Sequence, residues 1–521
     1  MTTYELNVEK RISNAISRRR FLKYAGATAA IVGASALGLD YFLNLGSGNN
    51  VGNKTSTTSN TITPDKTPPT IQDYKLVPNP DKVQNDKPYE LDLSFTAEDS
   101  ESALDLSAVS LAFEPIYPPE IPKAAYTSEP SSFQTTYTLN PASVSPDGKK
   151  ATFSQPIAGF VGGKQYRSTI KVKDKAGNEA ESSVDNPYVR EFENVARKLK
   201  VKASAFYYPV YTLYGRDFQG DNTIPLLGYY DSEDPNVINK QIDWGSGFGI
   251  GTFLPSFTAP THPSTSIMKN VYLNSPIVSD MKFAFLYESG GRLKPVTANG
   301  LTHLDVNDPS SIAHIKTDFE LFANKFFNNP NYLRIDNKPV VYLYLSRIYT
   351  GDIPSFLNGL RSHVADLGFE LFLVGDEVFW YDNPNSLGVQ KRIQQYDAIA
   401  PFIMYSLGDY ELLNNFETKV DTKFSEWSQV AKKLNLKFIP SALPGYDARK
   451  APWNTDPNLV PLERSPQRFR KQLDICAKYL DPELETFLIY YNELNENTGI
   501  EPSKEEGFTY LNVLHDFLMS L

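Results

Sequence analysis

The chain has 521 residues, a formal net charge of −10 and 13% aromatic residues. This length exceeds what one hydrophobic core usually serves, so we expect more than one folded unit. Lys and Arg are scattered along an acidic chain and form no basic stripe, which excludes nucleic acid as an expected partner.

The first residues resemble an export signal. Ser17 to Lys23 reads SRRRFLK and precedes a weakly apolar, small-residue run from Tyr24 to Leu39, as in twin-arginine signals, which carry folded proteins across a membrane. We therefore expect residues 1–45 to engage the twin-arginine translocation machinery, and the protein to be extracytoplasmic. Ala34-Ser35-Ala36 suits a cleavage site, but the run could also stay as a membrane anchor, so secreted and membrane-tethered forms are both open.

Residues 46–69 are rich in Ser, Thr, Asn and Gly and predict a flexible linker. Residues 70–190 then show short segments with a period of two, which indicates strands with one buried face and an all-β sandwich. These segments are Tyr89 to Ala97, Val109 to Phe113, Thr135 to Leu139 and Tyr166 to Asp174. The closing run Val172 to Glu179 resembles the last strand and turn of immunoglobulin-like modules, so we expect a spacer or accessory unit. A carbohydrate-binding module is the alternative.

From residue 196 to residue 521 apolar, strand-like runs alternate with helix-period segments. The expected strands are Val201 to Val210, Gly249 to Phe257, Met281 to Glu288, Lys338 to Arg347, Leu371 to Val378, Ala398 to Tyr405, Leu436 to Pro444 and Thr486 to Asn492. The expected helices are Asp308 to Phe327, Ile353 to Leu367, Phe424 to Leu434, Ser465 to Leu480 and Ser503 to Leu518. This alternation indicates a parallel sheet covered by helices, either a (β/α)8 TIM barrel or a doubly wound sheet.

We favour the barrel because polar and aromatic residues gather where the strands end. Tyr208, Glu288, Tyr405 and Asn492 all occupy such positions. In a barrel these strand ends converge on one mouth, where TIM-barrel enzymes place their chemistry. The predicted fold is therefore multidomain, with an immunoglobulin-like sandwich followed by a (β/α)8 barrel.

The single cysteine excludes an intramolecular disulfide bond. Cys476 lies in a run with helical spacing, Leu473 to Leu480, and we expect it to pack as a small hydrophobic side chain. The five histidines show no spacing typical of metal ligands, so the sequence predicts no metal and no cofactor.

Two glutamates follow the last expected strand. If Ile489 and Tyr491 point into the barrel, alternation places Glu493 above its interior, and Glu496 lies in the loop beyond. Glycoside cleavage needs one carboxyl group that protonates the leaving oxygen and a second, ionised one that activates the attacking group. Glu493 and Glu496 are therefore the candidate catalytic residues, and a polysaccharide or glycan is the expected substrate.

Several segments resemble glycoside hydrolase family 99, the endo-α-mannosidases and endo-α-mannanases, and related family-99-like proteins. The segment from Asn492 to Pro502 reads NELNENTGIEP and is similar to the family's Asn-Glu-Trp-x-Glu-Gly-x-x-Ile/Leu-Glu-Pro signature. The segment from Tyr230 to Gln241 resembles its Tyr-Asp-x-x-Asp-Pro-x-x-Ile-x-x-Gln motif, and Phe206 to Pro209 and Lys338 to Tyr344 resemble its first and fourth strands. The similarity spans roughly residues 200–521.

The resemblance implies an endo-acting α-mannoside hydrolase that retains anomeric configuration through attack by the sugar's own 2-hydroxyl group and an anhydro-sugar intermediate. It implies that Glu493 is the base that deprotonates this hydroxyl. Glu496 would protonate the leaving oxygen and later activate water. Asn492, Tyr208, Glu288 and Tyr405 are the candidates for binding the sugar hydroxyl groups.

The departures from the family signature leave the substrate in doubt. Leu494 stands where the family has Trp, Asn495 where His or Ala is usual, and Asn497 where it has Gly. A catalytically inactive, glycan-binding barrel is therefore a second hypothesis. A transferase-like relative and a structural surface protein are further alternatives.

Overall fold

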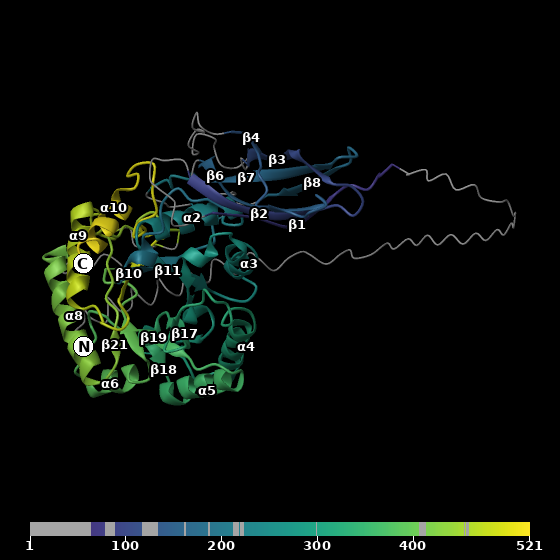
Figure 1. Cartoon of the computed structure of the whole chain (residues 1–521). Helices are drawn as coiled ribbons and strands as arrows, with labels where there is room; N and C mark the ends of the chain where they lie inside the picture. Colours follow the sequence, from purple (N-terminus) through teal and green to yellow (C-terminus); the bar gives the residue numbers. More distant parts are fainter. Residues whose placement is uncertain are drawn as a thin grey trace, which may run out of the picture.

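The structure is a computed structural model, and it describes residues 64–78, 89–116, 134–160, 163–185, 188–211, 218, 223–298, 300–405, 413–452, 454 and 458–521. The expected export signal, and all of the linker before residue 64, lie outside the described residues. A β-rich unit and a larger helix-covered unit follow each other along the chain (Figure 1).

The β-rich unit consists of two antiparallel sheets. One sheet has the order β1 (Thr70–Pro78), β2 (Tyr89–Glu98), β6 (Lys150–Phe160), β5 (Ser143–Val144). The other has the order β4 (Thr136–Thr138), β3 (Leu104–Ile116), β7 (Lys164–Asp174), β8 (Glu179–Val184), and β9 (Tyr188–Val189) also pairs with β7. The four strands expected from the sequence coincide with β2, β3, β4 and β7.

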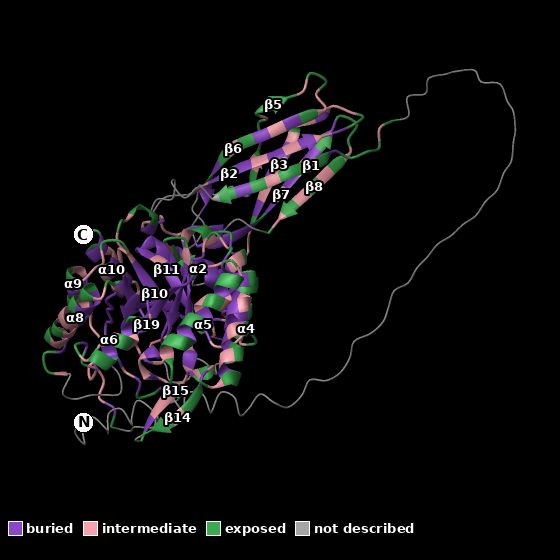
Figure 2. Ribbon diagram, turned by 90° about the horizontal axis from the view of Figure 1, so that it is seen from below, coloured by how far each residue is buried: buried purple, intermediate pink, exposed green. Residues whose placement is uncertain are grey.

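Side chains from both sheets form one apolar core. Phe95 and Phe153 stack with ring centroids 4.4 Å apart, and Phe113 and Ile170 of the second sheet belong to the same cluster. Figure 2 shows the resulting alternation of buried and exposed residues along these strands. The sandwich arrangement follows from this pattern, while the immunoglobulin-like relationship stays a prediction.

The larger unit is built on eight parallel strands that follow one another around a sheet in chain order. They are β10 (Lys202–Tyr207), β11 (Ile250–Phe257), the pair β12 (Lys282–Phe283) and β13 (Phe285–Tyr287), β17 (Lys338–Leu343), β19 (Phe372–Asp376), β20 (Ala398–Ala400), β21 (Lys437–Phe438) and β22 (Thr486–Tyr490). Ser441, just after β21, forms a parallel bridge with Leu488 of β22. The two edges of the sheet therefore meet, and all eight expected strands are confirmed.

Helices connect these strands and lie outside the sheet (Figure 1). They are α2 (Pro235–Gly247), α3 (Pro263–Asn270), α4 (Pro309–Lys325), α5 (Ile353–Asp366), α6 (Leu387–Ile393), α8 (Phe416–Lys433), α9 (Pro466–Lys478) and α10 (Thr509–Leu518). The strand order, strand direction and intervening helices are those of a (β/α)8 barrel. The structure thus favours the barrel over the doubly wound alternative.

A repeated local signal starts several helices. In α2, α4 and α9 an Asp or Ser side chain accepts a hydrogen bond from a backbone N–H of the first turn, and a proline follows it directly. The side-chain oxygen satisfies an N–H group that has no partner within the helix, and proline has no N–H group at a position where none is needed.

Shorter elements lie between these strands and helices. A small sheet contains β14 (Lys294–Ala298), β15 (Leu301–Asp305) and β18 (Tyr349–Thr350), and β16 (Arg334–Ile335) pairs with β17. Single 3-10 turns are η2 (Ala196–Lys198), η3 (Tyr272–Asn274), η4 (Val278–Asp280), η5 (Ser289–Gly291) and η6 (Ser346–Ile348).

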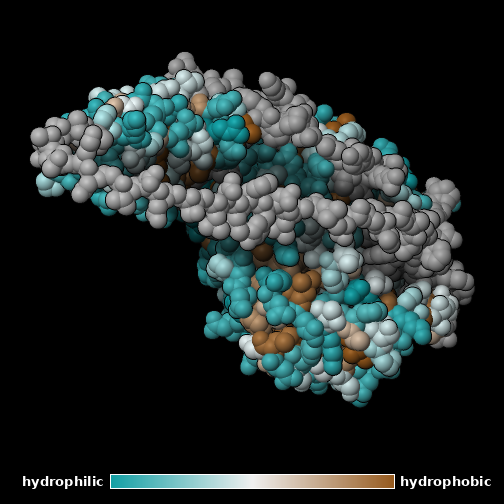
Figure 3. Space-filling model, turned by 90° about the vertical axis from the view of Figure 1, so that its right-hand side faces the viewer, coloured by the Kyte–Doolittle hydropathy of each residue, from teal (hydrophilic) through white to brown (hydrophobic). Residues whose placement is uncertain are grey.

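The outward faces of the barrel strands pack against the helices. Phe285 stacks on Phe322 of α4 at 4.5 Å, and Phe487 meets Phe517 of α10 at 5.7 Å. Cys476 of α9 is fully buried, and burial raises the pKa of its thiol, which confirms the expected packing role. On the face shown in Figure 3, hydrophobic residues form patches among mostly hydrophilic ones.

Strand β9 joins the two units through two adjacent residues. Val189 belongs to the sandwich core, whereas Tyr188 belongs to the barrel core and donates a hydrogen bond to Asp243 of α2 over 2.8 Å. The backbone N–H groups of Glu191 and Phe192 donate to the same carboxylate. Burial, with a smaller contribution from nearby Glu191, raises the pKa of Asp243 to about 7.

Among the helices of the described residues, none is both long and apolar enough to cross a membrane.

Candidate functional site

The side chains of the last barrel strand, β22 (Thr486–Tyr490), face the opposite way from the one expected. Leu488 lines a small cavity inside the barrel together with Phe206 and Phe402. Tyr490 packs against these same two rings, with centroids 5.2 and 5.7 Å away. The alternate face, which includes Tyr491, points toward the helices, so the prediction that Ile489 and Tyr491 fill the interior is wrong. Both faces of this strand are apolar, and alternation alone therefore could not choose between them.

The chain beyond β22 folds back on the strand it has just left. Ile500 and Glu501 donate backbone hydrogen bonds to the carbonyl groups of Tyr490 and Tyr491 over 2.9 and 2.7 Å. Gly499 donates to the carbonyl of Glu493 over 3.2 Å. We call residues 492–501 the rim loop. Its two ends are held together, which fixes the backbone that carries Glu493 and Glu496.

Two backbone positions in the rim loop explain residue choices in the sequence. A Cβ atom at Gly499 would lie 2.8 Å from the carbonyl oxygen of Tyr491 and 2.9 Å from the backbone nitrogen of Glu493, so only glycine fits. Asn497 has a φ of +55°, in the left-handed region that Gly and Asn tolerate best. Its departure from the family's Gly therefore preserves the conformation of the loop.

Asn492 links the last barrel strand to the first. Its side-chain oxygen accepts a hydrogen bond from the N–H group of Tyr208 over 2.7 Å, and its amide nitrogen donates to the carbonyl of Tyr208 over 3.1 Å. The amide nitrogen also lies 3.3 Å from the hydroxyl group of Tyr230. Asn492 is fully buried, and these hydrogen bonds position the rim, while its contact with a sugar stays a prediction.

The two distant segments of the family-99-like resemblance meet in one buried cluster. Gln241 donates from its amide nitrogen to Glu501 over 2.7 Å, and Tyr230 donates from its hydroxyl to the other oxygen of Glu501 over 2.9 Å. Tyr207 donates to the amide oxygen of Gln241 over 2.5 Å. Burial raises the pKa of Glu501 to about 7 although both hydrogen bonds favour its ionised form. The hydrogen bonds from Tyr230 and Gln241 thus hold Glu501, the last residue of the rim loop, in place.

Glu493 and Glu496 are both buried, with 3% and 5% of their surfaces exposed. Both contribute to the electrostatic environment of one hydroxyl group that the sequence did not single out, that of Tyr490. Burial and then the negative charge of Glu496 raise the pKa of Tyr490 well above its usual value, with smaller contributions from groups that include Asp376 and Glu493. Tyr490 is fully buried, and its hydroxyl oxygen has no hydrogen-bond partner among the described residues. The rim loop thus carries two buried acidic side chains whose negative charges act on the phenol of Tyr490, the last residue of β22.

The other predicted rim residues differ in accessibility. Tyr208 directly follows β10 and is 9% exposed, and Glu288 follows β13 and accepts a hydrogen bond from Ser256 over 2.8 Å. Both keep the rim positions expected of them. Tyr405 is fully buried and donates its hydroxyl hydrogen to the carbonyl of Val460 over 2.8 Å, while its contact with substrate stays a prediction.

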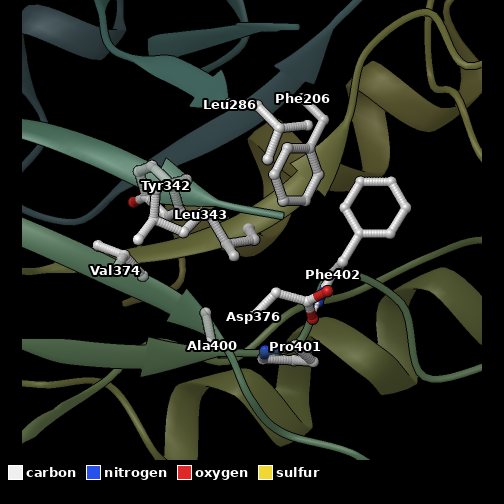
Figure 4. A pocket seen from close by; sticks show the side chains of 10 residues that line it. Phe206, Leu286, Tyr342, Leu343, Val374, Asp376, Ala400, Pro401 and Phe402 are labelled. Carbon is white, nitrogen blue, oxygen red and sulfur yellow. Dashed lines mark hydrogen bonds between the residues drawn. The ribbon is translucent and has the colours of Figure 1, made fainter. Parts of the chain in front are cut away.

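Two further carboxylates at the end of β19 serve the framework of the barrel. Asp376 accepts hydrogen bonds from the N–H groups of Leu345 and Phe402 over 3.0 and 2.8 Å, and it pairs with Arg347. Figure 4 shows its carboxylate beside Phe402 at the margin of the small cavity. Asp376 thereby ties the ends of three neighbouring strands to one another.

Glu377 is fully buried, and it is bound by Ser346 over 2.8 Å and by Arg392 over 2.6 Å. Burial raises its pKa although Arg392 opposes the shift. These contacts give the carboxylate a structural role. At the barrel rim, the described residues include no group of His, Cys, Asp and Glu arranged to hold a metal ion.

The strand order and the closed edges define a helix-covered parallel barrel of the TIM type, and solved structures with this fold resemble it. One, described as a glycoside hydrolase-like protein, is 24% identical with a TM-score of 0.51, and the match covers 64% of this chain and 97% of that chain. The GH99 endo-alpha-mannosidase from Bacteroides thetaiotaomicron is 17% identical with a TM-score of 0.44, covering 61% of this chain and 95% of that chain. The likeness to the first of these structures shows that the two chains share a fold.

Sequence relatives give a different description. Residues 306–514 match a family model described as Glycosyltransferase WbsX. Two proteins from Xanthomonas campestris pv. campestris, both named Uncharacterized protein WxcX, are 21% identical over 320 residues. These matches cover 56% of this chain and 42% of the relatives, so the chain spans less than half of their length.

The tight packing at Gly499 gives a prediction for stability. We expect Gly499→Ala to lower the free energy of unfolding by roughly 1–3 kcal/mol, because the added Cβ atom meets backbone atoms that cannot rotate away. Gly359→Ala in α5 is the matched control, since nothing lies within 4 Å of a Cβ atom there. The control should stabilise the protein by up to about 1 kcal/mol. Urea unfolding of both variants measures the difference, and equal effects would contradict the packing described here.

The raised pKa of Glu501 predicts a dependence of stability on pH. Because the folded-state pKa of about 7 lies above the ordinary value of 4.5, the folded protein binds more protons than the unfolded chain between these values. The contribution of this group to stability is complete below about pH 4.5 and is lost as the pH rises through about 7. We expect Glu501→Gln to remove a decline on the order of 1 kcal/mol per pH unit in this window. Urea unfolding from pH 5 to pH 8 measures it, and an unchanged slope would contradict the prediction.

Proposed function

We propose that this protein is an exported glycan-processing enzyme that cleaves α-linked, mannoside-type polysaccharide or glycan from within the chain. The observation that carries the proposal is that two buried glutamates, Glu493 and Glu496, lie on the rim loop that directly follows the last barrel strand. TIM-barrel enzymes place their catalytic residues at the C-terminal ends of the barrel strands. The glycoside hydrolase fold and the family-99-like signature support the same reaction class.

In the proposed mechanism Glu493 removes the proton of the 2-hydroxyl group, and the sugar oxygen attacks the neighbouring anomeric carbon. The bond to the leaving oxygen breaks as Glu496 gives that oxygen its proton, which leaves an anhydro sugar. Glu496 then takes a proton from water, the water oxygen attacks the anomeric carbon as its bond to the 2-oxygen breaks, and Glu493 returns a proton to the 2-oxygen. The low exposure of both carboxyl groups limits competition from bulk water.

Tyr490 contributes a hydrogen-bond donor to this site. Since its pKa lies far above neutrality, the phenol keeps its proton at every pH at which the enzyme would act. Tyr208 and Glu288 remain the proposed contacts to sugar hydroxyl groups, whereas Asn492 acts by holding the rim loop on β10. Leu494, which stands where the family has Trp, is 5% exposed and belongs to the apolar core of the barrel.

A glycosyl transfer reaction is the second candidate, favoured by the family model that covers residues 306–514. The same pair of carboxyl groups would serve it if a sugar hydroxyl group replaced water in the second step. The two reactions differ in their products, since transfer lengthens an acceptor chain and hydrolysis only shortens the donor. A barrel that binds glycans without turnover would give neither product.

We predict that Glu493→Gln and Glu496→Gln each lower turnover of α-linked mannan by roughly 10²-fold or more, because each change removes an ionisable group of nearly unchanged volume. Chromatography of products formed with and without an excess of acceptor oligosaccharide measures hydrolysis and transfer together. Glu463→Gln, at an exposed position, is the control and should keep full activity. Thermal unfolding should show that all three variants remain folded.

Retained turnover in either of the first two variants would contradict the assignment of the catalytic pair. Binding of mannan by the unchanged protein, without any new product, would contradict an enzymatic role and leave the binding hypothesis.

The export proposal has its own test. We expect Arg18→Lys combined with Arg19→Lys to keep the protein in the cytoplasm, because twin-arginine recognition depends on this pair. Arg20→Lys preserves the pair and should leave export intact. Cell fractionation followed by immunoblotting measures both outcomes, and equal export of the two variants would contradict this route.

A further inference from the structure

Three aspartates from separate parts of the chain meet at one end of the sandwich. Asp65 precedes β1, Asp99 follows β2, and Asp174 ends β7. One carboxylate oxygen from each lies within 4.8 Å of the other two. Asp99 and Asp174 are only 4% and 2% exposed, whereas Asp65 is partly exposed, so two of the three carboxylates are largely removed from water.

Hydrogen bonds fix these carboxylates without satisfying them. Oδ1 of Asp99 accepts from the N–H groups of Glu101 and Ser102 over 2.8 and 2.6 Å, but its buried Oδ2 has no hydrogen-bond partner among the described residues. Oδ1 of Asp65 accepts from the N–H group of Thr67 over 2.8 Å, and its buried Oδ2 likewise has no partner there. Buried acceptors without partners are rare in native proteins and point to a missing ligand.

The third carboxylate belongs to a turn that orients it toward the cluster. Asn178 donates from its backbone N–H group to Oδ1 of Asp174 over 2.8 Å and from its amide nitrogen to Oδ2 over 2.7 Å. The same amide nitrogen lies 3.2 Å from the carbonyl oxygen of Asp65. The turn after β7 and the chain before β1 are therefore held against each other beside the cluster.

The charges of the cluster are not balanced by side chains. Within the part of the chain that the structure describes, no Lys or Arg forms an ion pair with any of the three aspartates. The nearby Lys149 instead donates to the carbonyl of Ser100 over 3.0 Å. Three ionised aspartates would place three negative charges together, which is costly unless a cation neutralises them.

We propose that Asp65, Asp99 and Asp174 bind a calcium ion. Calcium takes carboxylate oxygens at about 2.3–2.6 Å, so two of its ligands on opposite sides lie up to roughly 5 Å apart. The separation of at most 4.8 Å in the cluster fits a single ion bound by all three carboxylates. Zinc prefers nitrogen and sulfur ligands, and magnesium prefers a compact octahedron with several water molecules, so calcium fits these ligands best.

The bound ion would link the start of the sandwich to both of its sheets. It would join the chain before β1 to the ends of β2 and β7, one strand from each sheet. This site differs from the sequence expectation of no metal, which rested on the spacing of His and Cys residues. Carboxylates 34 and 75 residues apart give no such local pattern.

Calorimetric titration and thermal unfolding of the whole chain test the proposal. In calcium chloride the unchanged protein should bind one ion, and its melting temperature should rise by roughly 4 °C or more over its value in EDTA at a calcium concentration ~100-fold above the dissociation constant. Asp99→Asn and Asp174→Asn should lose both the heat of binding and this rise. They should stay folded in EDTA, because each removes a repelling charge.

Asp185→Asn is the matched control, since Asp185 lies in the same sandwich but is 63% exposed and pairs with Arg167. It should keep the full response to calcium. Absence of binding in the unchanged protein, or an undiminished response in Asp99→Asn and Asp174→Asn, would overturn the site. An equally strong response to magnesium would overturn the assignment to calcium.

Discussion

In a closed sheet the last strand must pair with the first, and the side chain of Asn492 continues that pairing where the backbone leaves it. Tyr491 still donates a backbone hydrogen bond to Phe206 over 2.9 Å. One residue later, the carboxamide of Asn492 takes the place of a peptide group against both polar atoms of Tyr208. The backbone of residue 492 is thereby released to turn, while the two strand ends stay joined. The position of the rim loop, and of the glutamates on it, depends on these side-chain hydrogen bonds, which replace backbone pairing between the two strands.

The acidic groups around the barrel mouth are held in chemically different ways. Asp376 and Glu377 have arginine partners and join neighbouring segments. Glu501 has neutral donors, Gln241 and Tyr230, and a pKa raised to about 7. The negative charges of Glu493 and Glu496 act on the phenol of Tyr490. Because similar carboxyl groups differ so much in their partners, a role in chemistry has to be argued from each environment, not from proximity to strand ends alone.

Much of the fold could be predicted because its signals are local. Apolar runs and turn residues located all eight barrel strands, and Asp-Pro or Ser-Pro pairs mark the starts of α2, α4 and α9. The face that each strand turns inward could not be predicted for β22, since Leu488 and Ile489 are equally apolar. The hydrogen bonds of Asn492 and Tyr405 could not be predicted, because their partners, Tyr208 and Val460, are far away in the sequence. Tyr490 was missed because an aromatic residue in a strand normally indicates packing.

The contacts of β9 with α2 have a practical meaning for anyone who wishes to study the barrel by itself. Tyr188 is covalently part of the sandwich but lies in the barrel core, and three donors from residues 188–192 converge on the carboxylate of Asp243. A shortened chain that begins at Ala196 would leave that acid inside the protein with none of these donors. The β-rich unit and the barrel are therefore joined through residues 188–192. A shortened chain that begins before Tyr188 keeps all the residues of the barrel core.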